Sequence, residues 1–185
     1  IYANNNSTGI AADAHVNLSN GTIDLGASEN AVGVFVDKGT VIDSGSTITV
    51  GKNGVALYAK DSVVTLAGTT INLFGDNSLG LYLDGTTSFT GSGNININGQ
   101  NVVLFNMNSS GAISNSFNVV SVAPGSTYTL GNITGGVFEY TGSSNLASNG
   151  TLVSGTNSAI YLSGSAITAA PGTTNVAGVA LNGPY

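Results

Sequence analysis

The sequence predicts an all-β fold, a right-handed parallel β-helix in which three short strands make up each coil. One phrase returns along the chain: VGVFVDKG begins at residue 32, VALYAKDS at 55 and LGLYLDGT at 79. Apolar and polar residues alternate within the segments, as in STITVG at residue 46, which is the pattern of a strand. Gly, Asn, Ser and Asp clusters interrupt the apolar segments at short intervals, so no helix fits between them.

The first strand of each coil is expected to begin at positions 8, 32, 55, 79, 102, 135 and 158. Two further apolar columns keep the same period and mark the second and third strands. They are Leu18, Ile42, Leu66, Phe89, Val122 and Leu146, then Ile23, Ile48, Ile71, Ile95, Tyr128 and Leu152. About seven coils of about 23–24 residues, stacked at about 4.8 Å, predict a rod of roughly 35 Å with isoleucines on top of one another inside it. Parallel crossovers favour right-handed winding.

The interval between the starts at 102 and 135 is longer than the others by about ten residues, and the columns place this excess within 106–118, NMNSSGAISNSFN. We expect a loop insertion there, either a tolerated surface excursion or a carrier of specificity. Both ends of the chain cut into the repeat, so residues 1–185 are interpreted as a single β-helix segment of a longer protein.

The amino-acid composition argues against several classes of function. Only 6% of the residues are charged, Arg is absent, and three lysines face nine acids for a net charge of −6. Too few cations are present to neutralise a nucleic-acid backbone or to favour an anionic bilayer. The absence of Cys suits export through an oxidising compartment. No apolar run is long enough to span a bilayer as a helix, and the first residues, IYANNNSTG, are not a signal peptide.

The candidate binding surface is a column of rings, one from each coil. Alternation along the first strand puts Val32, Val34 and Val36 on one face and Gly33 and Phe35 on the other. The aliphatic face is expected to be the core, so the rings are predicted to point outward. The predicted column is Phe35, Tyr58, Tyr82, Phe105, Phe138 and Tyr161, beside a groove of small residues at Gly33, Ala56, Gly80, Gly136 and Ala159. Such a strip would bind sugar rings or a protein, or the rings would only stabilise the stack.

Catalytic chemistry is not predicted. The acids are scattered, and the best cluster, Asp37 and Asp84 with Lys60 between them, has the charge alternation of a surface ion-pair ladder. His15 is the only histidine, so no nucleophilic, metal or cofactor site is expected, and the chain is interpreted as not an enzyme. Thr-x-Thr pairs, at Thr47 and at Thr127, leave an ice-binding surface as an alternative.

Repeats such as NSLGLYLDGTTSFTGSGNININGQN and NAVGVFVDKGTVIDSGSTITVGKN resemble the passenger regions of type V autotransporter adhesins of Gram-negative bacteria. The resemblance covers residues 8 to 183 and implies an extracellular rod at the bacterial cell surface, tethered through an outer-membrane barrel that this chain lacks. It implies adhesion to glycans or proteins of host or bacterial cells, with no shared site residues. A polysaccharide-active solenoid and a pure stalk spacer stay open as alternatives.

Overall fold

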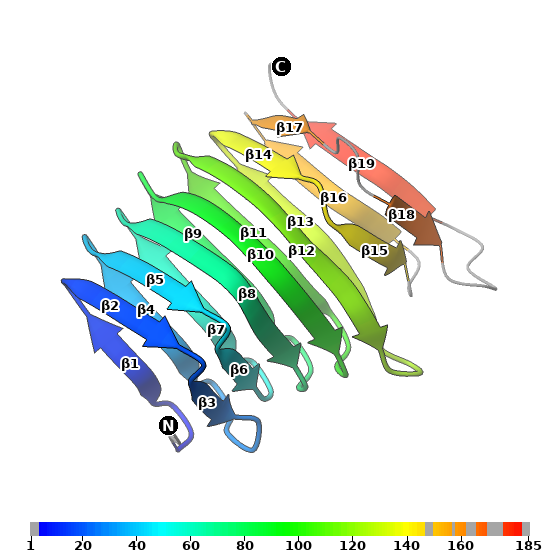
Figure 1. Ribbon diagram of the computed structural model, residues 1–185. Coiled ribbons are helices and arrows are strands. Elements are labelled where there is room, and N and C mark those ends of the chain that lie inside the picture. The colour runs from blue at the N-terminus through cyan, green and yellow to red at the C-terminus, as the bar shows by residue number, and fades with distance from the viewer. Residues whose placement is uncertain (1–3, 147–149, 157, 162–165, 170–175, 183–185) are drawn as a thin grey trace.

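The computed structural model is an all-β parallel solenoid of about six turns, which confirms the predicted fold class. It describes residues 4–146, 150–156, 158–161, 166–169 and 176–182, and this part of the chain contains no helix. Every strand pairing is parallel, and each strand pairs with its counterpart one coil away (Figure 1). The coils therefore lie side by side along the rod, from the first residues at one end to the last at the other.

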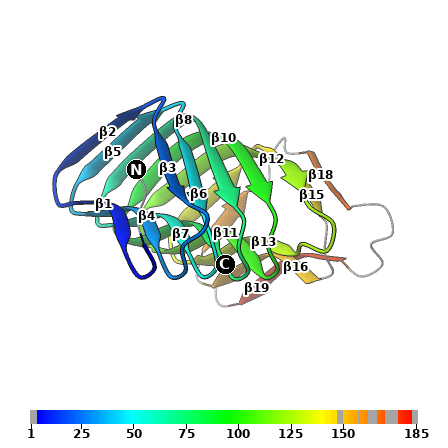
Figure 2. The ribbon, with the colours of Figure 1, turned by 90° about the horizontal axis from the view of Figure 1, so that it is seen from below.

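Two long sheets form the walls of the rod, and the core lies between them. The eight-stranded sheet consists of β1 (Thr8–Ala12), β4 (Val32–Asp37), β7 (Val55–Lys60), β9 (Leu79–Gly85), β11 (Val102–Ser109), β13 (Tyr128–Thr134), β16 (Gly150–Thr156) and β19 (Val176–Asn182). The nine-stranded sheet consists of β2 (His15–Ser19), β3 (Thr22–Leu25), β5 (Thr40–Ser44), β6 (Thr47–Val50), β8 (Val63–Leu73), β10 (Ser88–Ile97), β12 (Ala112–Val122), β14 (Val137–Tyr140) and β17 (Ala159–Tyr161). A two-stranded sheet joins β15 (Ser143–Leu146) to β18 (Ala166–Ala169). Figure 2 shows the chain crossing from one wall to the other in each coil.

Three separate strands per coil, as predicted, occur in the first two coils. In the next three coils the second and third strands merge into one long strand, β8, β10 or β12, that bends at the corner between them, and separate strands return with β14 and β15. Residues with positive φ mark this corner in successive coils, with Gly45 at φ 77° and Gly68 at φ 69°. At Gly93 the register of β10 shifts and φ is 152°. Glycine suits these positions because it adopts positive φ without a steric penalty.

The predicted isoleucine column is confirmed. Ile23, Ile48, Ile71 and Ile95 are paired in register through β3, β6, β8 and β10, and each is at most 2% exposed. They form the centre of the core, in which each coil places the same side chain over the last. The burial of aliphatic surface along this column is the main favourable term for stacking the coils.

The second predicted column is wrong by one residue at Ile42, and it is wrong again at Phe89, which is paired in register with Val64 rather than Leu66, and at Val122, which is paired with Ile97. Val41 is the inward residue, Ile42 is 49% exposed, and Asp43 points into the core, where it is paired in register with Leu18 and Leu66. Asp43 is held by polar neighbours at the corner: its Oδ2 accepts hydrogen bonds from the Ser46 N–H (3.3 Å) and from the Thr69 hydroxyl. Burying an acid costs free energy unless it is hydrogen-bonded, which explains this arrangement.

The loop insertion predicted at 106–118 is also wrong. Residues 106–109 belong to β11 and residues 112–118 to β12, with only a short turn between them. The long interval arose because GGVFEYTG at 135 resembles a first strand, whereas β14 belongs to the nine-stranded sheet and pairs with β12. The first strand of that coil is β13, so the period there remains close to the usual value: Val103 is paired with Leu79 and with Thr129.

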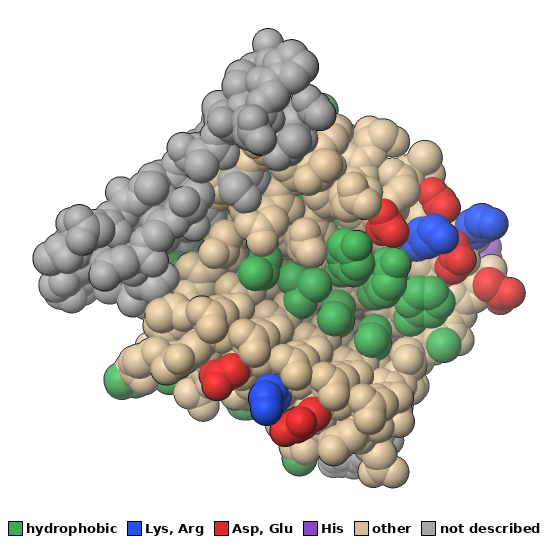
Figure 3. Space-filling view, turned by 180° about the vertical axis from the view of Figure 1, so that it is seen from behind, with side chains coloured by type: hydrophobic (Ala, Val, Ile, Leu, Met, Phe, Trp, Pro, Cys, Tyr) green, Lys and Arg blue, Asp and Glu red, His purple; other side chains and the backbone are tan. Residues whose placement is uncertain are grey.

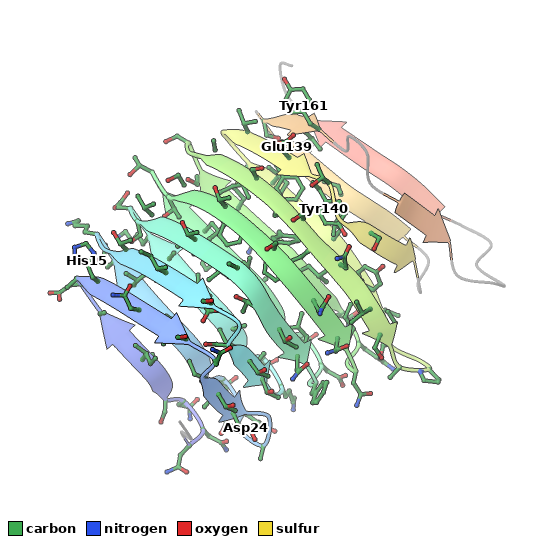
Figure 4. The ribbon with its side chains drawn as sticks, in the orientation of Figure 1. His15, Asp24, Glu139, Tyr140 and Tyr161 are labelled. Carbon is green, nitrogen blue, oxygen red and sulfur yellow. The ribbon has the colours of Figure 1, made fainter. Side chains whose placement is uncertain are left out.

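Aromatic rings make up much of the same core in the later coils. Phe89, Phe105, Phe117, Phe138 and Tyr140 are all buried, with centroid separations of 5.6 to 6.4 Å between neighbouring rings. Figure 4 labels Tyr140, whose hydroxyl lies 2.8 Å from the Phe117 carbonyl and 3.0 Å from that of Ser143. Burial raises the pKa of Tyr140 well above its usual range.

Candidate functional site

The outer side of the eight-stranded sheet carries the candidate site, which we call the apolar face. It consists of an aliphatic column, Val32, Val55, Leu79 and Val103, and a ring column, Phe35, Tyr58 and Tyr82. All seven side chains are partly exposed, and within each column consecutive residues are paired in register. Figure 3 shows the hydrophobic patch on this side of the rod.

The three rings contact one another along the rod. The Phe35 and Tyr58 rings meet edge to face, with centroids 5.2 Å apart, and the Tyr58 and Tyr82 rings are tilted by 33° with centroids 4.7 Å apart. Both separations lie in the range in which aromatic pairs attract. Tyr58 and Tyr82 therefore each cover part of one flat side of the other ring.

A local irregularity of the first strand turns the rings outward. Gly33 and Val34 are both buried, so two successive residues face the interior before Phe35 turns out. A Cβ on Gly33 would lie 2.9 Å from Ile48 Cγ2 and 2.5 Å from the Ala56 carbonyl oxygen. Ala56, at the equivalent position, is 0% exposed. The predicted outer groove of small residues is therefore wrong at Gly33, Ala56 and Gly80, which are all buried, because this column faces the core at the bend.

The predicted ring column is wrong from its fourth ring, Phe105, onward. Phe105 is paired in register with Leu81 rather than with Tyr82, and it is completely buried. Asn106 takes the outer position, since an inward amide would be buried without a partner there whereas a ring gains from burial.

The last two predicted rings lie on the other sheet. Phe138 is buried in β14, paired in register with Ile113. Tyr161 is 56% exposed but lies in β17, where it is paired in register with Glu139; Figure 4 labels both residues. The ring column thus ends at Tyr82, and the polar residues Asn106 and Thr129 bound the apolar face at its far end.

Charged residues lie along both edges of the apolar face, which is visible in Figure 3. On one edge Asp37, Lys60 and Asp84 are paired in register on β4, β7 and β9, as the sequence predicted. The predicted ion-pair ladder is not formed within the described residues, because the one ion pair they contain joins Lys52 and Glu29 at 3.8 Å. Asp84 instead accepts hydrogen bonds from the Asn108 amide (3.0 Å) and the Tyr58 hydroxyl (3.4 Å).

The opposite edge repeats the same order of charges, a feature that the sequence reasoning missed. Glu29, Lys52 and Asp76 occupy equivalent turns of three successive coils, since each accepts a backbone hydrogen bond from the corner residue one coil earlier. Each lies eight residues before its counterpart on the first edge, as in Lys52 and Lys60. The residues eight apart therefore have the same sign in each of these three coils, while Lys38 beside Asp37 and Asp61 beside Lys60 add the opposite charge to the first edge. This spacing of eight was readable in the sequence.

The polar side chains on the first edge, that of Asp37, Lys60 and Asp84, differ in their hydrogen bonding. One oxygen of Asp37 is enclosed without a hydrogen-bond partner, and no carboxylate of the described residues lies within ion-pair distance of Lys60. Partial burial, and after it the charge of Asp84, raises the pKa of Tyr58. Asp61, one residue beyond Lys60, accepts hydrogen bonds from the Thr86 backbone (2.9 Å) and hydroxyl (3.1 Å), which lower its pKa.

An asparagine ladder runs beside the second edge. Asn30, Asn53 and Asn77 all have φ between 53° and 57°, in the left-handed region. Their side chains form a chain of amides in which Asn30 donates to Asn6 (3.1 Å), Asn53 to Asn30 (3.0 Å) and Asn77 to Asn53 (3.3 Å). Asn is the residue besides Gly that tolerates this backbone. The ladder fixes the corner at which every chain segment enters the apolar face.

The other residues singled out by the sequence are dispersed. His15 is exposed at the start of β2 (Figure 4), and the described residues contain no group of three or more His, Asp or Glu side chains placed to hold a metal. Thr47 and Thr49 lie on the nine-stranded sheet and Thr129 on the eight-stranded one, so the two Thr-x-Thr pairs do not share a face. No helix within the described ranges has the length and apolar character to cross a membrane.

Comparison with family models, with curated proteins and with solved structures finds no match to this chain. The function must therefore be argued from the fold and from the apolar face.

Proposed function

We propose that this chain is a segment of a bacterial surface adhesin, a rod that presents its apolar face to a glycan or protein of a host or bacterial cell. The observation that carries the proposal is the apolar face itself. Seven partly exposed apolar side chains lie together over four coils, on a rod with otherwise few charges. Contiguous exposed apolar surface of this kind is more often an interaction site than a surface that binds nothing.

The arrangement around the face supports binding rather than chemistry. Rings and aliphatic side chains offer area with little loss of conformational freedom, while the charged edges provide orientation. The carboxylates of Asp37 and Asp84, which the sequence placed in one column, are separated by Lys60 on the coil between them. That the chain is not an enzyme stays a prediction.

The location also belongs to the proposal. A long parallel solenoid, free of cysteine and poor in charge, suits a protein that is exported unfolded and folds outside the cell. Together with the resemblance of the repeats to autotransporter passengers, this supports a rod at the cell surface, anchored by a part of the protein outside this chain.

The test is a binding comparison between two double variants. Tyr58→Ser with Tyr82→Ser removes two rings from the apolar face. Ile42→Ser with Val63→Ser removes two apolar side chains, 49% and 51% exposed, from the opposite sheet and serves as the matched control. Glycan arrays and assays of adhesion to bacterial and host cells measure binding, and circular dichroism checks that each variant folds.

We expect the ring variant to lose at least about tenfold in affinity while the control keeps it, because aromatic anchors carry most of the energy of an interface. Equal binding by both variants and the unaltered chain would refute a role for the apolar face. Binding by none of them would leave this segment as a stalk that holds another part of the protein away from the cell.

A further inference from the structure

Three Asn-Gly steps lie wholly within the described residues, at Asn20, Asn53 and Asn98. In such a step the backbone nitrogen of the glycine can attack the side-chain carbonyl carbon of the asparagine, because glycine has no Cβ to obstruct the approach. All three asparagines are exposed. Exposure therefore does not distinguish the three steps, and their hydrogen bonds must be compared.

The step at Asn20 is held by hydrogen bonds on both of the reacting groups. Asn20 has φ of 48°, and its side-chain amide donates to the Ser19 hydroxyl (3.4 Å). The Gly21 N–H donates to the hydroxyl of Ser46 in the next coil (3.0 Å). This nitrogen can turn towards the side chain of Asn20 only after that bond breaks, which costs free energy.

The step at Asn53 is held in the same way. Its side chain belongs to the asparagine ladder, in which it donates to Asn30 (3.0 Å) and accepts from Asn77 (3.3 Å). The Gly54 N–H donates to the Gly51 carbonyl (3.1 Å) within the turn. Both reacting groups of this step are therefore engaged elsewhere.

The step at Asn98 differs, although the chain on either side of it is anchored. Asn98 follows the end of β10, and its N–H donates to the Leu73 carbonyl (2.9 Å). The Gly99 carbonyl accepts from the Thr127 N–H (3.2 Å). These two bonds hold the corner in place but involve neither of the reacting groups.

The peptide unit between Asn98 and Gly99 is unpaired. Among the hydrogen bonds of the described residues, none involves the Asn98 side chain, the Asn98 carbonyl or the Gly99 N–H. The next coil continues from Ala123 to Pro124, and proline has no N–H to donate to this carbonyl. The nucleophilic nitrogen and the amide that it would attack are thus both free of competing bonds.

We propose that Asn98 is a site of spontaneous deamidation in the folded rod. The Gly99 nitrogen forms a bond to Asn98 Cγ, the Cγ–Nδ2 bond breaks, and ammonia leaves with the proton that the Gly99 N–H gives up through solvent. Water then opens the five-membered succinimide. Attack at Cγ gives aspartate, and attack at the main-chain carbonyl carbon gives isoaspartate. Water is the only co-reactant.

The product changes the corner of the rod. Ile97 and Leu73 are paired in register, so the residue after each, Asn98 and Phe74, lie on neighbouring coils, and the new negative charge appears beside a ring that is 45% exposed. In the isoaspartate form the main chain is one atom longer. The bonds to Leu73 and Thr127 then no longer fit the same register, and preparations of the chain become mixtures that grow more acidic with time.

The experiment follows all three asparagines in one sample of the full chain. The chain is incubated at mildly alkaline pH, folded and in parallel unfolded in urea, and peptide mapping by mass spectrometry measures conversion at each residue. In urea the three Asn-Gly steps should react at rates within about threefold of one another, because no hydrogen bonds hold them. In the folded chain Asn98 is expected to react at least about tenfold faster than Asn20 and Asn53. Gly99 packs against the Gly75 carbonyl, so the folded rate at Asn98 should still lie below its rate in urea.

Two variants test the reason for this order. Asn98→Gln should abolish the modification at residue 98, because the longer side chain would have to form a six-membered ring, and it removes no hydrogen bond of the described residues. Ser46→Ala removes the hydroxyl that accepts from the Gly21 N–H, so Asn20 should react several-fold faster while the rate at Asn98 stays the same. Circular dichroism checks that both variants fold.

Several results would overturn the proposal. One is a folded chain in which Asn98 reacts no faster than Asn20 or Asn53. Another is a folded chain that leaves Asn98 intact after the unfolded chain has reacted completely. An unchanged rate at Asn20 in Ser46→Ala would refute the argument from hydrogen bonds by which Asn98 is chosen. The proposed function does not depend on any of these outcomes, because Asn98 lies outside the apolar face.

Discussion

The asparagine ladder provides a sharp test of how the coils are held in register. Asn53 combines φ of 54° with two side-chain hydrogen bonds, one donated to Asn30 and one accepted from Asn77. Asn53→Ala removes both bonds, worth about 0.5 kcal/mol each at an exposed site, and forces a Cβ-bearing residue without a compensating amide into left-handed backbone, which costs about 1–2 kcal/mol. The expected loss of unfolding free energy is about 2–3 kcal/mol.

Asn53→Gly separates the loss of the hydrogen bonds from the cost of the left-handed backbone. Glycine removes the same hydrogen bonds but adopts positive φ freely, so the loss is expected to be about 1–2 kcal/mol, including the flexibility that glycine adds to the unfolded chain. Glycine should thus be the better replacement at residue 53. At Asn17, exposed in β2 where the pairing with β5 runs without a register shift, the order should reverse and alanine should be the better replacement. Urea unfolding followed by circular dichroism measures all four variants, and an alanine variant at least as stable as the glycine variant at residue 53 would refute the reasoning.

Two further predictions concern the corner glycines and the aromatic core. A Cβ at Gly93 would lie 1.9 Å from the Thr69 carbonyl oxygen, whereas nothing lies within 4 Å of one at Gly68, so Gly93→Ala should destabilise by at least about 3 kcal/mol and Gly68→Ala by only about 1–2 kcal/mol. Thermal unfolding of the pair checks this, and equal losses would contradict it. Because the folded pKa of Tyr140 is raised, the folded state keeps its proton above about pH 10 where the unfolded chain loses it, so stability is retained below that pH and falls above it by up to about 1.4 kcal/mol per pH unit. Tyr140→Phe should flatten the fall between about pH 10 and 12 in urea titrations, and an unchanged slope would show that the hydroxyl does not contribute.

The repeat predicted the fold because stacking coils requires equal lengths and equivalent residues. A short, constant period that holds three apolar segments leaves a parallel solenoid as the simple solution, and the isoleucine column through Ile48 followed directly from it. The isoleucine column could be predicted from alternation alone, because its residues lie in regular strands and not at a bend.

The faces were harder to predict because simple alternation fails where a strand bends. Gly33 and Val34 both turn inward, and the same happens at Leu104 and Phe105, which moves the ring of Phe105 into the core. The sheet that contains Phe138 can be predicted only by counting strands from the preceding coil. The residues around Phe138 do not reveal it, because they resemble a first strand. Asp43 was missed because its polar partners come from the corner and from the next coil.

The apolar face is proposed to be the surface that is covered on binding. A single introduced tryptophan reports this directly, because the chain contains no tryptophan of its own. Tyr82→Trp places the reporter on the apolar face, and Ile42→Trp places it on the opposite sheet as the control. The measurement is the emission maximum of each variant as a glycan or cell-surface preparation identified in the binding assays is added. If the apolar face is covered on binding, the emission at residue 82 shifts to the blue while that at residue 42 does not change. Binding that shifts the emission at residue 42 alone, or leaves residue 82 exposed to water, would contradict this.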